Sequence, residues 1–163
     1  MLSMKLERLK DVQMEELMQW SDTLENILTP DRLNPTTIKE YPQYIQTAER
    51  LKRICDWKAD DIKDKMTDIE DVIMDSISNA EYVFKYNAGG MPVYKKKYDT
   101  NDKRQRELRF RLKNHEHYQE LALEYKQWRI MYSDWVSHAK RLHRDFRLLE
   151  VNYTSNGGDG SDI

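Results

Sequence analysis

The sequence is poor in the residues that interrupt helices or cross-link a chain. It contains five glycines, four prolines and a single cysteine, Cys55, among 163 residues. A single cysteine excludes an intramolecular disulfide and fits a reducing compartment. So few glycines and prolines leave little material for the turns of a large sheet. We therefore predict an all-α fold built from long amphipathic helices.

Long apolar runs are also absent. No stretch approaches the roughly 18 apolar residues that a membrane-spanning helix needs. The first residues, MLSMKLERLKDVQ, carry charges where a signal peptide has an apolar stretch. We expect a soluble protein located in the cytoplasm, without a membrane partner.

The motifs of common catalytic and metal sites are missing as well. There is no G-x-x-x-x-G-K-[ST] phosphate loop and no G-x-S-x-G nucleophile elbow. The four histidines lack the spacing of three or four that places zinc ligands on one helix face, and no cysteine pair exists. Cys55 falls on an apolar stripe and is expected to be a buried small side chain. We predict no catalytic residues, no metal and no cofactor.

Charge, in contrast, is abundant and unevenly distributed. The formal net charge is only −2, but residues 1–84 hold 11 Lys/Arg against 18 Asp/Glu. Residues 85–113, called here the basic segment, hold 10 Lys/Arg against 3 Asp/Glu. Charges more than about 8–10 Å apart are screened at physiological salt, so a nearby polyanion responds to this local excess.

The basic segment predicts a nucleic-acid interface. Its Lys and Arg side chains can neutralise phosphates, and its aromatic side chains can stack on bases, which are free in a single strand. Phe110 lies between two arginines, although it can also be a core residue of the last helix. The candidate binding residues are Lys85, Tyr94, Lys95, Lys96, Lys97, Tyr98, Lys103, Arg104, Arg106, Arg109, Arg111 and Lys113.

Other interpretations of the basic segment remain open. It can complement the acidic first half, within one subunit or between neighbours, as part of a structural protein. An anionic membrane is a weaker candidate partner because the segment lacks an apolar face.

The order of helix signals and helix breakers predicts one helical domain over residues 1–153. Three prolines interrupt the region after the first helix, and NAGGMP interrupts the region before the basic arm. Asp102 is expected to cap the last helix, within which a break at Asn114–His115 is possible. The predicted parts are a helix at 4–27, an extended connector at 28–42, a helix at 43–86, a break and basic arm at 87–101, a helix at 102–153 and a disordered tail at 154–163.

The last helix carries a heptad pattern that is kept for more than four repeats. Such a pattern favours left-handed packing against other helices, and its large aromatics suit a multi-helix bundle or a ring of subunits. We interpret these side chains as packing positions rather than as a stacking platform for bases. The pattern also includes Ala139. The predicted oligomerisation residues are its large members, Tyr118, Leu121, Tyr125, Trp128, Tyr132, Trp135, Leu142, Phe146 and Leu149.

Over roughly residues 43–151 the order of these parts resembles the UvsY-type recombination mediators of large tailed phages. The resemblance is carried by three segments: a helix that ends in NAEYVFKYNAGG, the basic stretch KKKYDTNDKRQRELR, and the C-terminal helix NHEHYQELALEYKQWRIMYSDWVSHAKRLHRDFRLLEV. It is a similarity of pattern rather than of a diagnostic motif. The family places DNA-contacting cations late in the helix before the break, but that stretch is acidic here. Binding would therefore rest on the segment after Pro92.

The resemblance implies a helical homo-oligomer, with a ring as its expected form. Such a protein binds single-stranded DNA without sequence preference, competes with single-strand-binding protein and loads a RecA-like recombinase. A phage-encoded chain would act in the host cytoplasm. Two alternatives remain: a structural helical oligomer, such as a virion component or adaptor, and a regulator of a host enzyme whose acidic half mimics nucleic acid.

Overall fold

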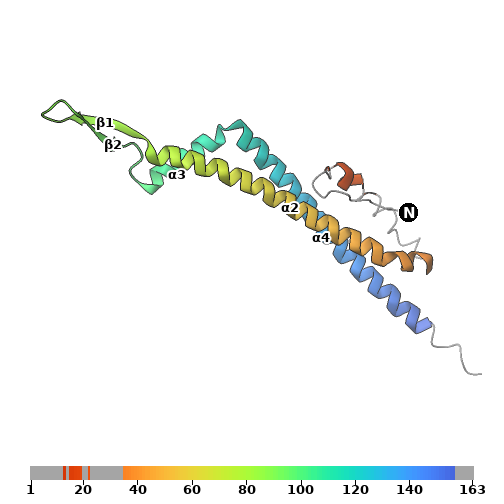
Figure 1. Ribbon diagram of the computed structural model, residues 1–163. Coiled ribbons are helices and arrows are strands. Elements are labelled where there is room, and N and C mark those ends of the chain that lie inside the picture. The colour runs from red at the N-terminus through yellow and green to blue at the C-terminus, as the bar shows by residue number, and fades with distance from the viewer. Residues whose placement is uncertain (1–12, 14, 20–21, 23–34, 157–163) are drawn as a thin grey trace, which may run out of the picture. The chain divides into compact units, whose positions relative to one another are not determined.

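The computed structural model describes residues 13, 15–19, 22 and 35–156. The elements labelled in Figure 1 are helices α2 (Pro35–Asn79), α3 (Asn101–Lys113) and α4 (Glu116–Asn156) and strands β1 (Glu81–Tyr86) and β2 (Pro92–Lys96). The all-α prediction is confirmed, with one two-stranded sheet added to it. The chain forms two compact units, one of Met1–Trp57 with Trp128–Ile163 and one of Lys58–Gln127.

In the first unit, the beginning of α2 and the end of α4 lie antiparallel. The ring of Tyr41 stacks on that of Phe146, with 5.9 Å between centroids. Further along α2, Asp56 pairs with Arg129, which lies earlier in α4, at 3.2 Å. Large apolar side chains favour burial between two such helices. The buried apolar residues of this unit are Leu17, Tyr41, Ala48, Leu51, Ile54, Cys55, Trp128, Met131, Trp135, Ala139 and Leu142.

Cys55 is fully buried in this unit, as predicted. Desolvation by that burial is the largest cause that raises the pKa of its thiol, to about 12. The thiol is therefore neutral at physiological pH and acts as a small apolar side chain.

In the second unit, two contacts join α2 to the helices that follow it. The Tyr118 hydroxyl of α4 donates a hydrogen bond to Glu70 Oε1 at 2.5 Å, and Arg111 Nη1 of α3 donates to Ser76 Oγ at 3.3 Å. Ile62, Ile77 and Leu121 are buried in this unit.

The aromatic seam of α4 lies partly in the interior of the chain. Every seventh residue from Leu121 to Leu142 is buried, so these positions are not open to a second copy as the ring interpretation requires. The buried seam residues are Leu121, Trp128, Trp135 and Leu142. The half-buried ones are Tyr118, Tyr125, Tyr132, Phe146 and Leu149. Oligomerisation through the half-buried set stays a prediction.

The extended connector predicted at 28–42 from its prolines is wrong over residues 35–42. Residues 35–42 are helical, because α2 begins at Pro35 and continues through Pro42. A proline fits the first helical position, where its missing N–H has no helical partner. At Pro42 one backbone hydrogen bond is lost. Tyr41 beside it is fully buried and stacks on Phe146, and this packing offsets that loss.

The predicted helix at 43–86 is wrong in its last turns, because α2 ends at Asn79 and residues 81–86 form β1. The sequence EYVFKY is rich in Tyr, Val and Phe, which fit a pleated strand better than a helix. The basic arm, expected as an irregular loop, contains β2 instead.

The predicted helix at 102–153 is two helices, since the chain breaks at Asn114–His115. The first begins at Asn101, and its N-cap is Thr100 rather than Asp102. The second continues to Asn156, so the first residues of the predicted tail at 154–163 are helical. Of the predicted helix at 4–27, residues 15–19 and 22 are helical, and the remainder lies outside the described residues except for residue 13.

Over the described parts of the chain, none of the helices combines the length and the apolar content that crossing a bilayer requires.

Candidate nucleic-acid interface

Strands β1 and β2 form an antiparallel hairpin closed by residues 87–91. Glu81 pairs with Lys96 at the open end, and Tyr86 pairs with Pro92 beside the turn. The Asn87 side chain organises the turn, because its Oδ1 accepts hydrogen bonds from the N–H groups of Gly89 and Met91, at 3.0 and 2.9 Å. Gly90 has φ +77°, a conformation that glycine adopts without cost.

The strand period places different side chains on the two faces of the hairpin. Tyr82 lies opposite Lys95, so these two side chains share one face. Phe84 shares that face, because Lys95 Nζ lies 3.6 Å from the centroid of its ring. A register irregularity between Val83 and Lys85 accompanies this arrangement. Val83 lies opposite Tyr94 in the register, and Tyr86 lies opposite Pro92. The side chains of Val83, Tyr86 and Tyr94 lie toward the other face.

The hairpin has no covered face within the described structure. Every residue of β1 is exposed, and Val93 is the one residue of β2 that is half-buried. Figure 1 shows β1 and β2 as a ribbon that projects past the end of α2. Five large apolar or aromatic side chains of the two strands are among the exposed ones: Tyr82, Val83, Phe84, Tyr86 and Tyr94.

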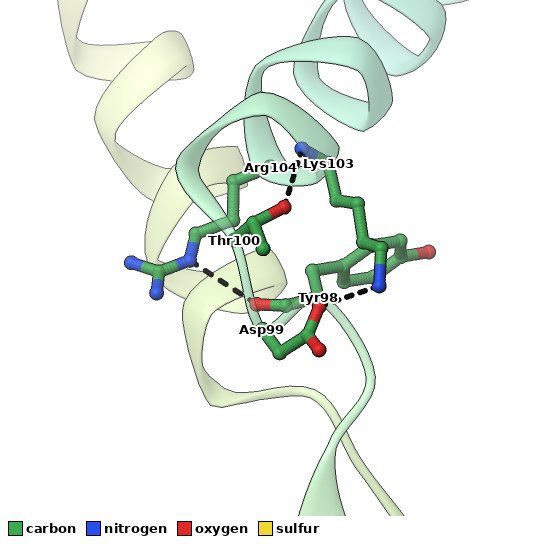
Figure 2. Close-up of polar contacts among 5 residues, drawn as sticks. All are labelled: Tyr98, Asp99, Thr100, Lys103 and Arg104. Carbon is green, nitrogen blue, oxygen red and sulfur yellow. Dashed lines mark hydrogen bonds and ion pairs between the residues drawn. The ribbon is translucent and has the colours of Figure 1, made fainter.

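A short polar junction connects the hairpin to α3 (Figure 2). Thr100 caps α3, since its hydroxyl accepts a hydrogen bond from the Lys103 N–H at 3.4 Å. Lys103 Nζ donates to Asp99 Oδ1 at 2.6 Å, and Arg104 Nε donates to the Tyr98 carbonyl oxygen at 3.2 Å. These bonds fix the direction in which α3 leaves the hairpin.

Helix α3 has a face of cations that have no partner among the described residues. Arg106, Arg109 and Lys113 are spaced by three and four residues, which places them on one side of the helix. Phe110 lies on the same side and is 65% exposed, so it is not the core residue that one interpretation expected. No side-chain hydrogen bond or ion pair involves these three cations in the described structure. We call these four residues the cationic face of α3.

Three other cations of the basic segment are paired with acids of the same segment or of β1. Lys96 pairs with Glu81 at 3.2 Å, Lys103 with Asp99 at 2.6 Å, and Arg111 with Glu107 at 2.8 Å. The hydrogen bond from Arg111 lowers the pKa of Glu107. The bond from Lys103 lowers the pKa of Asp99 in the same way. The two exposed pairs, Lys96–Glu81 and Lys103–Asp99, contribute little to stability, and phosphate can compete for their cations.

The structure thus divides the predicted binding cations into three groups. Lys85 and the cationic face of α3 have free charged groups in the described structure. Lys95 and Lys97 lie against the rings of Phe84 and Tyr98. The remaining cations make the pairs or the junction bond described above. Sequence reasoning missed Tyr82 and Phe84, although the alternating aromatics of EYVFKY before Asn-Ala-Gly-Gly are a hairpin signal.

Comparisons of this chain with protein families, with curated proteins and with solved structures found no match. The resemblance to UvsY-type mediators therefore stays a prediction from the sequence pattern.

Proposed function

We propose that this chain binds single-stranded DNA through the basic segment and acts as a recombination mediator. One observation carries the binding proposal: Lys85, Arg106, Arg109 and Lys113 have free charged groups in the described structure, whereas two of the segment's three acids, Asp99 and Glu107, already have cation partners. Arg106, Arg109 and Lys113 present their charges together on α3, and Lys85 adds another on the hairpin. Charge pairing of the segment within one subunit predicts instead that such charges would be neutralised by acids of the same chain.

The physical basis of binding is the release of counterions from the strand. Each phosphate neutralised by Lys or Arg on a single strand contributes a salt slope of roughly −0.7. Arginine also offers paired N–H donors to phosphate oxygens, which favours Arg106 and Arg109 as phosphate ligands. Binding of this kind has no base preference, as a mediator that coats any sequence needs.

The mediator role rests on the sequence pattern alone. In this role several copies would join their basic segments into one track, and multivalency would turn weak single contacts into tight, salt-sensitive binding. The strand would then be presented to a RecA-like recombinase in competition with single-strand-binding protein. No covalent step is required, so the proposal needs no catalytic residue.

Fluorescence anisotropy with a labelled single-stranded oligonucleotide tests the binding. If about four phosphates are neutralised, the affinity falls roughly 50-fold between about 50 and 200 mM salt. The triple variant Lys95→Glu, Lys96→Glu, Lys97→Glu should bind much more weakly. The matched control is Lys63→Glu, Lys126→Glu, Lys140→Glu, which changes exposed lysines outside the basic segment by the same total charge.

Absence of binding at the lower salt concentration overturns the proposal and favours the structural oligomer. Equal losses in the two triple variants would assign binding to net charge rather than to the basic segment. The mediator role needs its own readout, which is faster recombinase assembly on DNA coated with single-strand-binding protein. Binding without that acceleration would leave a DNA-binding protein that is not a mediator.

A further inference from the structure

One face of the hairpin combines two exposed aromatic rings with a lysine. Tyr82 and Phe84 are 47% and 48% exposed, and Lys95 lies opposite Tyr82 in the strand register. Lys95 Nζ sits 3.6 Å from the Phe84 centroid and so covers one side of that ring. Because Phe84 is still about half exposed in the described structure, part of its ring remains accessible to a ligand. We call Tyr82, Phe84 and Lys95 the stacking face.

This arrangement is unfavourable for a hairpin without a ligand. A two-stranded hairpin with no covering layer is marginally stable in water, and exposed aromatic rings add apolar surface to it. The rings gain when a flat, apolar surface covers them. The structure therefore presents them for contact with something outside the described chain.

Charge identifies the class of that ligand. The hairpin carries Lys85, Lys95 and Lys96 against one acid, Glu81, which is paired with Lys96. A ligand with flat rings along a chain of negative charges satisfies both the aromatics and the lysines. Unpaired nucleobases on a phosphate backbone have these properties, whereas paired bases in a duplex do not expose their flat surfaces.

We propose that the stacking face binds unpaired nucleobases, with Tyr82 and Phe84 as stacking residues and Lys95 as a phosphate ligand beside them. This inference rests on the proposed function and adds to it the group that distinguishes a single strand from a duplex. The cationic face of α3 then supplies the contacts that depend on phosphate alone.

Two probes separate base contacts from phosphate contacts. One is a 15-nucleotide oligo(dT), and the other is an abasic strand with the same number of phosphates. Stacking is expected to favour oligo(dT) by at least about fivefold for each stacked base. The variants Tyr82→Leu and Phe84→Leu remove the ring but keep an apolar side chain. They should reduce this preference and leave the affinity for the abasic strand unchanged.

Tyr86→Leu is the matched control, since Tyr86 is an exposed aromatic of the same strand that lies opposite Pro92. It should retain the preference for oligo(dT). A retained cross-strand nuclear Overhauser effect between the backbones of Val83 and Tyr94, which are paired in the register, verifies that each variant keeps the hairpin. A cross-linking experiment on the unaltered protein needs no variant: an oligonucleotide with 5-iododeoxyuridine should cross-link to Tyr82 or Phe84.

The outcomes distinguish this inference from the proposed function. If neither strand binds at low salt, both fail. If both strands bind equally, or if the leucine variants keep the full preference for oligo(dT), the stacking face is wrong while DNA binding stands. Cross-links confined to α3 would also overturn the stacking face.

Discussion

Gly90 donates its backbone N–H to the carbonyl oxygen of Asn87 at 3.0 Å and holds φ at +77° while doing so. This contact closes the turn that brings β2 back along β1. The hairpin, and with it the exposed aromatics and lysines, therefore depends on a residue that tolerates the left-handed conformation.

Replacement of Gly90 by alanine should destabilise the hairpin by about 1–2 kcal/mol, because a Cβ atom disfavours this conformation. Apart from the two adjacent residues, none of the described residues lies within 4 Å of the added atom, so the effect comes from backbone strain. Hydrogen exchange of the cross-strand amides should become about 5–30 times faster. Gly89→Ala is the control, since its Cβ would meet Asn87 Oδ1 at an ordinary 3.5 Å. Equal exchange rates in the two variants would contradict this account of the turn.

Burial in the α4 seam predicts that truncating two leucines of this helix lowers the free energy of unfolding by very different amounts. Leu142 is fully buried, whereas Leu123 is 60% exposed. Leu142→Ala should lower the free energy of unfolding by about 2–5 kcal/mol, since it removes apolar contacts and leaves a cavity. Leu123→Ala should change it by no more than about 0.5 kcal/mol. Urea denaturation measures both, and similar losses would show that the seam is not packed as described.

The hydrogen bond between Tyr118 and Glu70 predicts a loss of stability in alkali. Desolvation, with a further contribution from the bond to Glu70, raises the pKa of Tyr118 to about 12. The folded pKa is above the unfolded value of 10.0, so this contribution is complete below pH 10 and is lost as the pH rises toward 12. The urea midpoint should therefore fall more between pH 9 and pH 11 in the unaltered protein than in Tyr118→Phe. The same fall in both proteins would exclude Tyr118 as the cause.

The sequence predicted the parts of the fold whose signal is a repeated pattern. The heptad positions recur without error, and every seventh one from Leu121 to Leu142 is buried. Their partner could not be predicted, because the same aromatic seam fits another subunit as well as α2. Tyr41 and Phe146 are about 100 positions apart in the sequence, and a heptad pattern does not indicate which distant residue a side chain contacts.

The prediction missed β1 and the first turns of α2 because the same residues carry sequence signals for two different structures. Phe84 continues the apolar stripe of the preceding helix, so β1 was interpreted as its last turn. Pro42 predicted an extended connector, but the burial of Tyr41 beside it stabilises the helix at this position. In the candidate site, the cations were predictable from composition, since charge does not depend on the fold. Which of them are paired depends on side-chain geometry, as for Lys96 beside Glu81 across the strands.

The salt dependence of single-strand binding tests the central claim, which is that the cationic face of α3 is open to phosphate. The variant Arg106→Gln, Arg109→Gln, Lys113→Gln should reduce the slope of log affinity against log salt by about 2, the value for three phosphates. The control Lys63→Gln, Lys126→Gln, Lys140→Gln removes the same charge elsewhere and should keep the slope. An unchanged slope in the α3 variant, or an equal reduction in both, would contradict the claim.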